Sequence, residues 1–141
     1  MRRALEVASA FPEDVPVGAV VFDAAGEELA AAGNEREATG DPTAHAEMLA
    51  LRSAAAAVGN YRLDEADLYV TLEPCPMCAG ALVHARIRRL IFGVRDLRFG
   101  GVRSKFRIAD TELLNHRVEV MEGVLAADCL TLLKDFFAAK R

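Results

Sequence analysis

The sequence predicts a layered α/β domain whose central sheet is mixed and partly parallel. Apolar runs rich in β-branched residues recur along the chain, as expected for buried strands. The first two runs are separated by only a short turn, which indicates an antiparallel hairpin. Segments with helical spacing separate the later runs, which indicates parallel strands joined by crossovers. No linker, repeat or low-complexity segment interrupts the 141 residues, so we expect a single domain over residues 1–141.

The first quarter of the chain is predicted to hold one helix and the hairpin. Residues 1–10 alternate apolar and charged side chains in the pattern of a short amphipathic helix. Residues 17–22 read as a buried strand, and residues 28–32 return as a second strand after a turn that contains Gly26. Residues 33–40 are polar and are expected to form a loop.

The middle of the chain is predicted to alternate helix and strand. Asp41 and Pro42 match the cap and first turn of a helix that continues over residues 44–57. Residues 67–72 place apolar side chains at every second position, which favours a strand. A proline then begins a second helix over residues 76–85.

The last third is predicted to complete the sheet and to cover it. Residues 88–94 read as a strand, and residues 95–110 as a basic loop that contains two adjacent glycines. Residues 117–121 favour a short strand. Residues 124–139 have the apolar spacing of a helix packed on the sheet.

Two stretches carry the candidate chemistry, His45-x-Glu47 and Cys75-x-x-Cys78. One imidazole and two thiolates make three ligands, the number that a catalytic zinc takes while its fourth position stays open. Both stretches fall at predicted helix N-termini, whose partial positive charge favours thiolates over thiols. Glu47 is placed to carry protons. We therefore expect one zinc ion per chain.

The cysteines have two other interpretations. A redox-active Cys-x-x-Cys pair would leave His45 and Glu47 without a role. A structural zinc would need a fourth ligand, for which the remaining candidates are Cys129, His84 and His116. Cys129 lies in an apolar helical pattern, which favours a buried small hydrophobic residue. The catalytic interpretation accounts for more of the residues.

The composition indicates a protein of a reducing compartment. Two of the three cysteines belong to the metal motif, which leaves no disulfide framework. No apolar run reaches the length of a transmembrane helix, and residues 1–10 lack the pattern of a signal peptide. We expect a cytoplasmic protein without a membrane partner.

The charge is unevenly distributed. The whole chain carries a net charge of −4, yet residues 86–107 hold eight basic side chains and one acidic side chain. Such asymmetry is typical of a surface that binds a polyanion. The alternative is a solvated loop with scattered arginines.

Over nearly its whole length the sequence resembles the bacterial tRNA adenosine deaminases. His-x-Glu with Pro-Cys-x-x-Cys is the signature of the zinc-dependent nucleobase deaminases in general. The segments at 61–63 and 115–117 and the basic loop are closer to the tRNA branch. The resemblance rests on residues 15–20, Asn34, 41–47, 61–63, 72–81, 84–87 and 115–120.

The resemblance implies a cytidine-deaminase-like three-layer α/β/α fold and a homodimer. It implies hydrolysis of adenosine to inosine at the wobble position of a tRNA, whose anticodon stem-loop would be the partner. His45, Cys75 and Cys78 would hold zinc, and Glu47 would shuttle protons. Substrate contacts would come from Asn34, His84 and Asp96. An RNA-facing surface would include Arg95, Arg98, Arg103, Lys105 and Arg107.

Some features leave other functions open. Arg103 stands where the family usually has a glycine, and residues 97–99 are bulkier than usual. From spacing alone, Asn34 is better explained as an Asx-turn residue. The first alternative is deamination of a free base or nucleoside, such as guanine, cytosine or a specialised metabolite. The second is a non-catalytic partner subunit that keeps zinc for folding, although such a subunit would be expected to lack Glu47.

Overall fold

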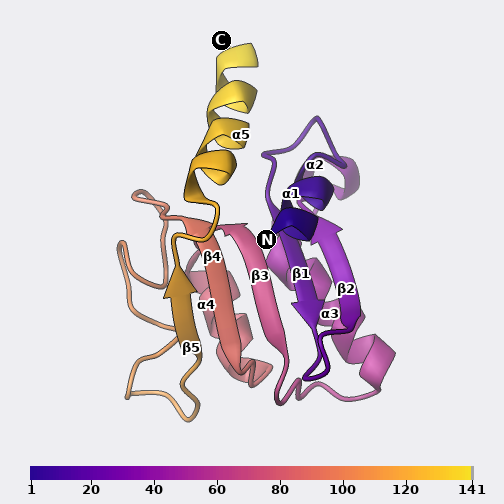
Figure 1. Cartoon of the computed structure of the whole chain (residues 1–141), viewed down its shortest axis with the longest axis vertical. Helices are drawn as coiled ribbons and strands as arrows, with labels where there is room; N and C mark the ends of the chain where they lie inside the picture. The colour runs from indigo at the N-terminus through magenta and orange to yellow at the C-terminus, as the bar shows by residue number, and fades with distance from the viewer. Residues whose placement is uncertain (141) are drawn as a thin grey trace.

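The computed structural model describes residues 1–140, which form a five-stranded sheet with helices on both faces (Figure 1). The strands are β1 (Gly18–Phe22), β2 (Glu28–Gly33), β3 (Asp67–Leu72), β4 (Arg89–Val94) and β5 (Glu119–Glu122). The helices are α1 (Arg2–Ala8), α2 (Arg36–Thr39), α3 (Ala46–Val58), α4 (Pro76–His84) and α5 (Ala126–Ala139). The predicted α/β class is confirmed.

The strand directions bring many connections to one edge of the sheet. The order is β2-β1-β3-β4-β5, and β1 is antiparallel to both of its neighbours. The pairs β3–β4 and β4–β5 are parallel, as the sequence predicts for a partly parallel sheet. Four strands therefore end at the edge where β1 begins. In sheets of this kind, binding sites form beyond the carboxyl ends of the strands.

The layers follow from the apolar pattern of the strands. In Figure 1, α3 and α4 lie behind the sheet, whereas α1 and the start of α5 lie in front of it. β3 and β4 run through the centre and are buried along most of their length, with Leu68, Val70, Leu90 and Phe92 fully enclosed. This rigid centre fixes the positions from which the site-bearing connections leave.

Three details differ from the prediction. The α3 helix begins at Ala46 rather than near Pro42, because the Asp41 carboxylate accepts hydrogen bonds from the Thr43 amide (2.8 Å) and hydroxyl (2.7 Å). Asp41 therefore forms an Asx-turn, although its position in the sequence resembles that of a helix cap. The polar segment 33–40 contains a single helical turn, α2.

The third difference concerns α5. It was expected to pack along the sheet, but Cys129 is its one buried residue among those described. Cys129 lies against Gly93 of β4, and beyond this contact the helix projects past the edge of the sheet (Figure 1). Within residues 1–140, no helix has the length and apolar character needed to cross a membrane.

Candidate active site

The three predicted ligands meet between two helix N-termini. His45 is the N-cap of α3, Cys75 is the N-cap of α4, and Cys78 lies in the first turn of α4. Their ligand atoms all lie within 4.8 Å of one another. The Nδ1 atom of His45 is 3.6 Å from the Sγ atom of each cysteine.

These distances fit a tetrahedral zinc. Zinc bonds of about 2.3 Å to sulfur and about 2.0–2.1 Å to nitrogen, meeting at a tetrahedral angle, hold the two atoms about 3.6 Å apart. The donor set of one imidazole and two thiols also matches the preference of zinc. His45, Cys75 and Cys78 are therefore arranged to hold a zinc ion through Nδ1 and two sulfur atoms.

The thiols are electrostatically prepared for a cation. The hydrogen bond from the Cys78 thiol, with a smaller effect of His45, lowers the pKa of Cys75 to about 4. The same hydrogen bond, together with burial, raises the pKa of Cys78. One thiolate is thus present at neutral pH, and a bound dication favours ionisation of the second.

Glu47 lies in the first turn of α3, two residues after His45, and only 4% of its surface is exposed. Burial raises the pKa of its carboxyl to about 7. A carboxyl with such a pKa can both accept and donate a proton near neutral pH, as a general acid–base group must.

A cavity of about 790 Å³, lined by His45, Glu47 and Cys75, opens at the edge where the strands end. Its size is in the range of small-molecule sites. The strand termini supply one part of the wall, and α5 supplies another through Leu133 and Phe137. The residues from the strand connections include Val15, Val17, Asn34, Leu72, Glu73, Arg95, Asp96, Leu97, Arg98 and Phe99.

Two of the three predicted substrate contacts line this cavity. Asn34 is buried, donates a hydrogen bond to the Val15 carbonyl (3.1 Å) and accepts one from the Ala46 amide (2.8 Å). It therefore also fixes the start of α3 beside His45. Asp96 accepts hydrogen bonds from two amides of its own turn. His84 is exposed at the end of α4, outside the cavity lining. Their roles toward a substrate remain predictions.

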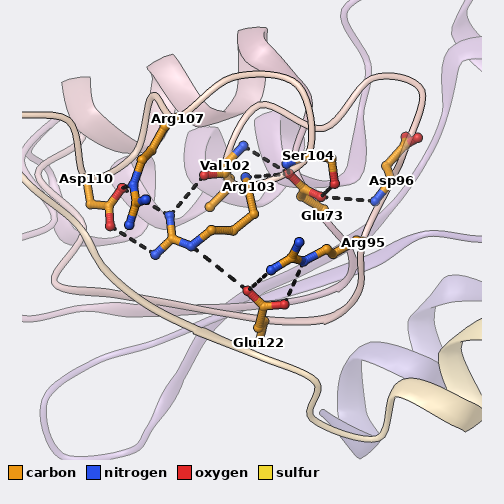
Figure 2. Close-up of polar contacts among 9 residues, drawn as sticks. All are labelled: Glu73, Arg95, Asp96, Val102, Arg103, Ser104, Arg107, Asp110 and Glu122. Atoms are coloured by element: carbon orange, nitrogen blue, oxygen red, sulfur yellow. Dashed lines mark hydrogen bonds and ion pairs between the residues drawn. The ribbon is translucent and has the colours of Figure 1, made fainter.

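The basic segment is largely neutralised by ion pairs that the sequence does not reveal. Arg95 pairs with Glu122 (2.8 Å), while Arg103 (2.9 Å) and Arg107 (3.3 Å) both pair with Asp110 (Figure 2). Within residues 1–140, Arg98 and Lys105 have no ion pair, so they are the members of the predicted RNA surface with unpaired charge.

Two other arginines of the segment are in ion pairs as well, and a third is bound by a neutral side chain. Arg88 and Arg89 both contact Asp67, at 3.0 Å and 2.6 Å. Arg86 donates a hydrogen bond to the side chain of Asn115 (2.6 Å). Residues 115–117, which contribute to the family resemblance, lie in the connection before β5, and this hydrogen bond ties that connection to the residues after α4. The local excess of positive charge is smaller in the fold than in the sequence.

The sequence-based reasoning missed Glu73. This carboxylate directly follows β3, is 2% exposed and accepts hydrogen bonds from the loop after β4 (Figure 2). The available signal was a glutamate placed between a buried strand and the Pro-Cys turn, a position where an unpaired charge would be costly. The α5 contribution to the cavity was also missed, because it depends on where that helix projects.

Comparison with known proteins places this geometry in a class. The profile of the family described as "Cytidine and deoxycytidylate deaminase zinc-binding region" matches residues 1–94. This range contains all three ligands and Glu47. The fold and the metal centre are therefore those of a zinc-dependent deaminase.

More similar relatives define the branch. The tRNA-specific adenosine deaminase of Haemophilus influenzae is 47% identical over the full chain and is itself 83% covered. That of Bacillus subtilis is 43% identical over the full chain and 88% covered. This chain belongs to the tRNA-specific adenosine deaminase family.

Solved structures of deaminases share this fold. A structure from a study of A-to-I editing by tRNA:A34 deaminases superimposes with a TM-score of 0.89 at 41% identity, covering 94% of this chain and 97% of that one. A guanine deaminase from Nitrosomonas europaea superimposes with a TM-score of 0.83 at 26% identity, covering 96% and 81%. The cytidine-deaminase-like fold is confirmed.

Proposed function

We propose that this chain hydrolyses adenosine to inosine at the wobble position of a tRNA anticodon. The observation that carries the proposal is the match along nearly the full chain, in sequence and in structure, to deaminases named for tRNA and for this reaction. The cluster of His45, Cys75 and Cys78, with His45, Cys75 and Glu47 lining an open cavity, supports it from chemistry.

The division of labour at the site follows from the positions of the side chains. His45, Cys75 and Cys78 would hold zinc. When zinc is bound, it would supply a water of lowered pKa beside the substrate. The Glu47 carboxylate takes a proton from the attacking water. It delivers this proton to the purine ring nitrogen, then takes the remaining proton from the hydroxyl now bonded to C6 and passes it to the amine, which leaves as ammonia. Its pKa of about 7 suits both transfers.

Three side chains are proposed to position the nucleotide. Asn34, which follows β2, and Asp96, which follows β4, both line the cavity. The Asn34 amide has one hydrogen left to donate after its bond to Val15, which suits an acceptor on a purine edge. His84 is retained as a substrate contact on the family resemblance alone.

The RNA surface is proposed to surround the cavity mouth. Arg98 lines the cavity and has no ion pair within residues 1–140, and Lys105 is exposed on the same loop. Both suit phosphate oxygens. Arg95, Arg103 and Arg107 belong to the same surface, but their charges are already shared with Asp110 and Glu122.

We also infer a homodimer in the cytoplasm. Large apolar side chains are exposed on the basic loop, at Phe106 (58%), and on the segment between this loop and β5, at Leu113 (92%) and Leu114 (44%). Exposed apolar groups of this kind are typical of surfaces that a partner covers. The cysteines of the described chain are free, as expected in a reducing compartment. Light scattering of the purified protein tests the dimer.

A second candidate function is deamination of a free purine. It is favoured by the superposition on a guanine deaminase with a TM-score of 0.83. The identity to that enzyme is 26%, well below the 41% to the tRNA deaminase structure. We therefore place the tRNA substrate first.

One assay distinguishes the two functions. Purified protein is incubated with total tRNA, with an anticodon stem-loop that carries a wobble adenosine, and with free guanine, adenine, cytosine and their nucleosides. Inosine is expected in the two RNA samples alone, with the wobble guanosine variant of the stem-loop as the matched control. Conversion of a free base without conversion of RNA would replace the proposal with the second candidate.

A further inference from the structure

The Glu73 carboxylate binds a single loop with all of its hydrogen bonds. Its Oε1 atom accepts hydrogen bonds from the Asp96 amide (3.0 Å) and the Ser104 hydroxyl (2.5 Å). Its Oε2 atom accepts three from the amides of Val102 (3.1 Å), Arg103 (2.7 Å) and Ser104 (3.0 Å). Figure 2 shows the loop folded around this carboxylate.

The loop also lies directly on the turn that carries Cys75. The Gly101 amide donates a hydrogen bond to the Pro74 carbonyl (2.8 Å). A Cβ atom at Gly101 would lie 2.6 Å from the Pro76 nitrogen, and one at Gly100 would overlap the Glu73 carboxylate. Two consecutive residues without side chains are thus needed for this contact.

The far side of the loop is fastened by ion pairs. The Arg103 guanidinium contacts Asp110 at 2.9 Å and reaches Glu122 of β5 at 3.9 Å, and Arg95 contacts Glu122 at 2.8 Å. The arginine that departs from the family pattern therefore points inward to these acids. The segment from Asp96 to Ser104 is held from both sides.

The same segment forms a wall of the cavity. Asp96, Leu97, Arg98 and Phe99 line it, and the last three lie between the two points where Glu73 binds the loop, at Asp96 and at residues 102–104. Leu97 (72%) and Phe99 (63%) are exposed, so their own packing does little to fix their positions. Glu73 and the ion pairs are left to determine where these side chains lie.

We propose that Glu73 is a positioning residue that shapes the 96–104 loop and thereby the binding of the substrate. This inference rests on the proposed function, because it assigns the loop to the RNA substrate. Glu73 acts through the loop. All five of its hydrogen bonds go to this one loop.

Three variants test the proposal. Glu73→Gln keeps the shape but turns one oxygen into an NH₂ group that cannot accept from the loop amides. Ser104→Ala removes a single bond and keeps the charge. Asp67→Asn is the matched control, because Asp67 is a buried carboxylate bound to two arginines at the opposite end of β3.

Amide hydrogen exchange gives the first readout. Hydrogen bonds to a charged acceptor are among the stronger ones, so Glu73→Gln is expected to speed exchange at residues 102–104 by at least about tenfold. Ser104→Ala should have a smaller effect and Asp67→Asn none. This measurement needs no substrate, so it decides on the loop even if tRNA is not the substrate.

Kinetics with the anticodon stem-loop give the second readout. Glu73→Gln should keep one zinc per chain and raise KM by at least about tenfold, with a smaller change in kcat. Asp67→Asn should leave KM unchanged. Wild-type exchange and KM in Glu73→Gln would overturn the proposal, as would an equal rise of KM in Asp67→Asn. Absence of any RNA turnover by the wild type would instead overturn the proposed function.

Discussion

Two buried carboxyl groups, each two residues from a metal ligand, have opposite electrostatic surroundings. Burial raises the pKa of Glu47 to about 7. Burial alone would also raise the pKa of Glu73, but hydrogen bonds from Ser104 and the loop amides outweigh it and leave this pKa below its usual value. Such divergence separates a group that exchanges protons from one that stays charged to hold structure.

Replacing Glu47 with glutamine should separate catalysis from metal binding. Glu47→Gln removes the proton carrier while it leaves all three ligands in place. Elemental analysis should still find about one zinc per chain. The rate of RNA deamination should fall by at least about 10²-fold, the lower end for loss of a general acid–base group.

The exposed Glu37 offers a matched control, since Glu37→Gln changes a glutamate of α2 away from the ligands. It should have wild-type zinc content and turnover. The proposed role of Glu47 would be wrong if Glu47→Gln turned over RNA at the rate of this control.

At the scale of elements, the parallel pair β3–β4 is joined at its start by one carboxylate. Asp67 accepts hydrogen bonds from Arg88 and Arg89, which stand where β4 begins. Burial raises the pKa of Asp67, but the two guanidinium groups outweigh this effect and lower it below its usual value of 3.8. The arrangement stabilises the fold while Asp67 is ionised.

Asp67→Asn should therefore destabilise the protein in a pH-dependent way. Because the pKa is lower in the folded state, the stabilisation is complete above about pH 4 and is lost as the pH falls through the folded value. At pH 7 the variant should be about 1–3 kcal/mol less stable than the wild type by chemical denaturation. This difference should shrink as the pH approaches 2.

The exposed pair Arg62–Asp64 (3.6 Å) provides the comparison. Asp64→Asn should change the free energy of unfolding little at any pH, since surface ion pairs contribute little. A difference between Asp67→Asn and wild type that stayed constant from pH 7 to pH 2 would contradict the assigned linkage.

At the scale of the whole molecule, acidic side chains from other parts of the chain form ion pairs with the arginines of the basic segment. Asp67, Asp110 and Glu122 neutralise arginines that are clustered in the sequence. Within residues 86–107, Arg86, Arg98 and Lys105 are the basic side chains left without an ion pair. Affinity for RNA should then depend on salt much less than the number of arginines implies.

Binding of the anticodon stem-loop measured against salt checks this expectation. Two phosphate contacts, from Arg98 and Lys105, correspond to a slope of about 1.4 log units of affinity per tenfold change in salt, whereas five contacts would give about 3.5. The double variant Arg98→Ala and Lys105→Ala should lose most of the slope. Arg62→Ala, an exposed arginine outside the basic segment, should keep it. A wild-type slope near 3.5 would show that the paired arginines also bind phosphates.

Sequence patterns predicted the strands and the ligand set because both depend on local order. Residues 67–72 become a strand through their apolar content, and the Cys-x-x-Cys spacing places both sulfurs on one turn of helix. The start of α3 was misplaced because Asp41 serves a cap and an Asx-turn equally well.

Other features depended on partners far along the chain. The role of Glu73 requires residues 23–31 positions away, and Arg95 meets its acid 27 positions away. The amphipathic pattern of 124–139 indicated a helix but not how much of it is buried. These contacts depend on how distant parts of the chain fold together, so local sequence patterns do not predict them.

Gly100 and Gly101 pack closely against residues 73–76, the turn that carries Cys75, and this contact has a consequence for protein engineering. The metal site comes from the connections after β2 and β3, whereas much of the substrate wall comes from the connection after β4. Such a division would allow the loop after β4, which would set substrate specificity, to be exchanged while the metal site stays the same. The contacts of this loop forbid a simple exchange, because a grafted loop needs the Glu73 carboxylate beneath it and two glycines above Pro76. A related deaminase that receives residues 95–110 together with Glu73 should retain both its metal and its fold. If it receives the loop alone, the loop should not fold against the metal-binding turn.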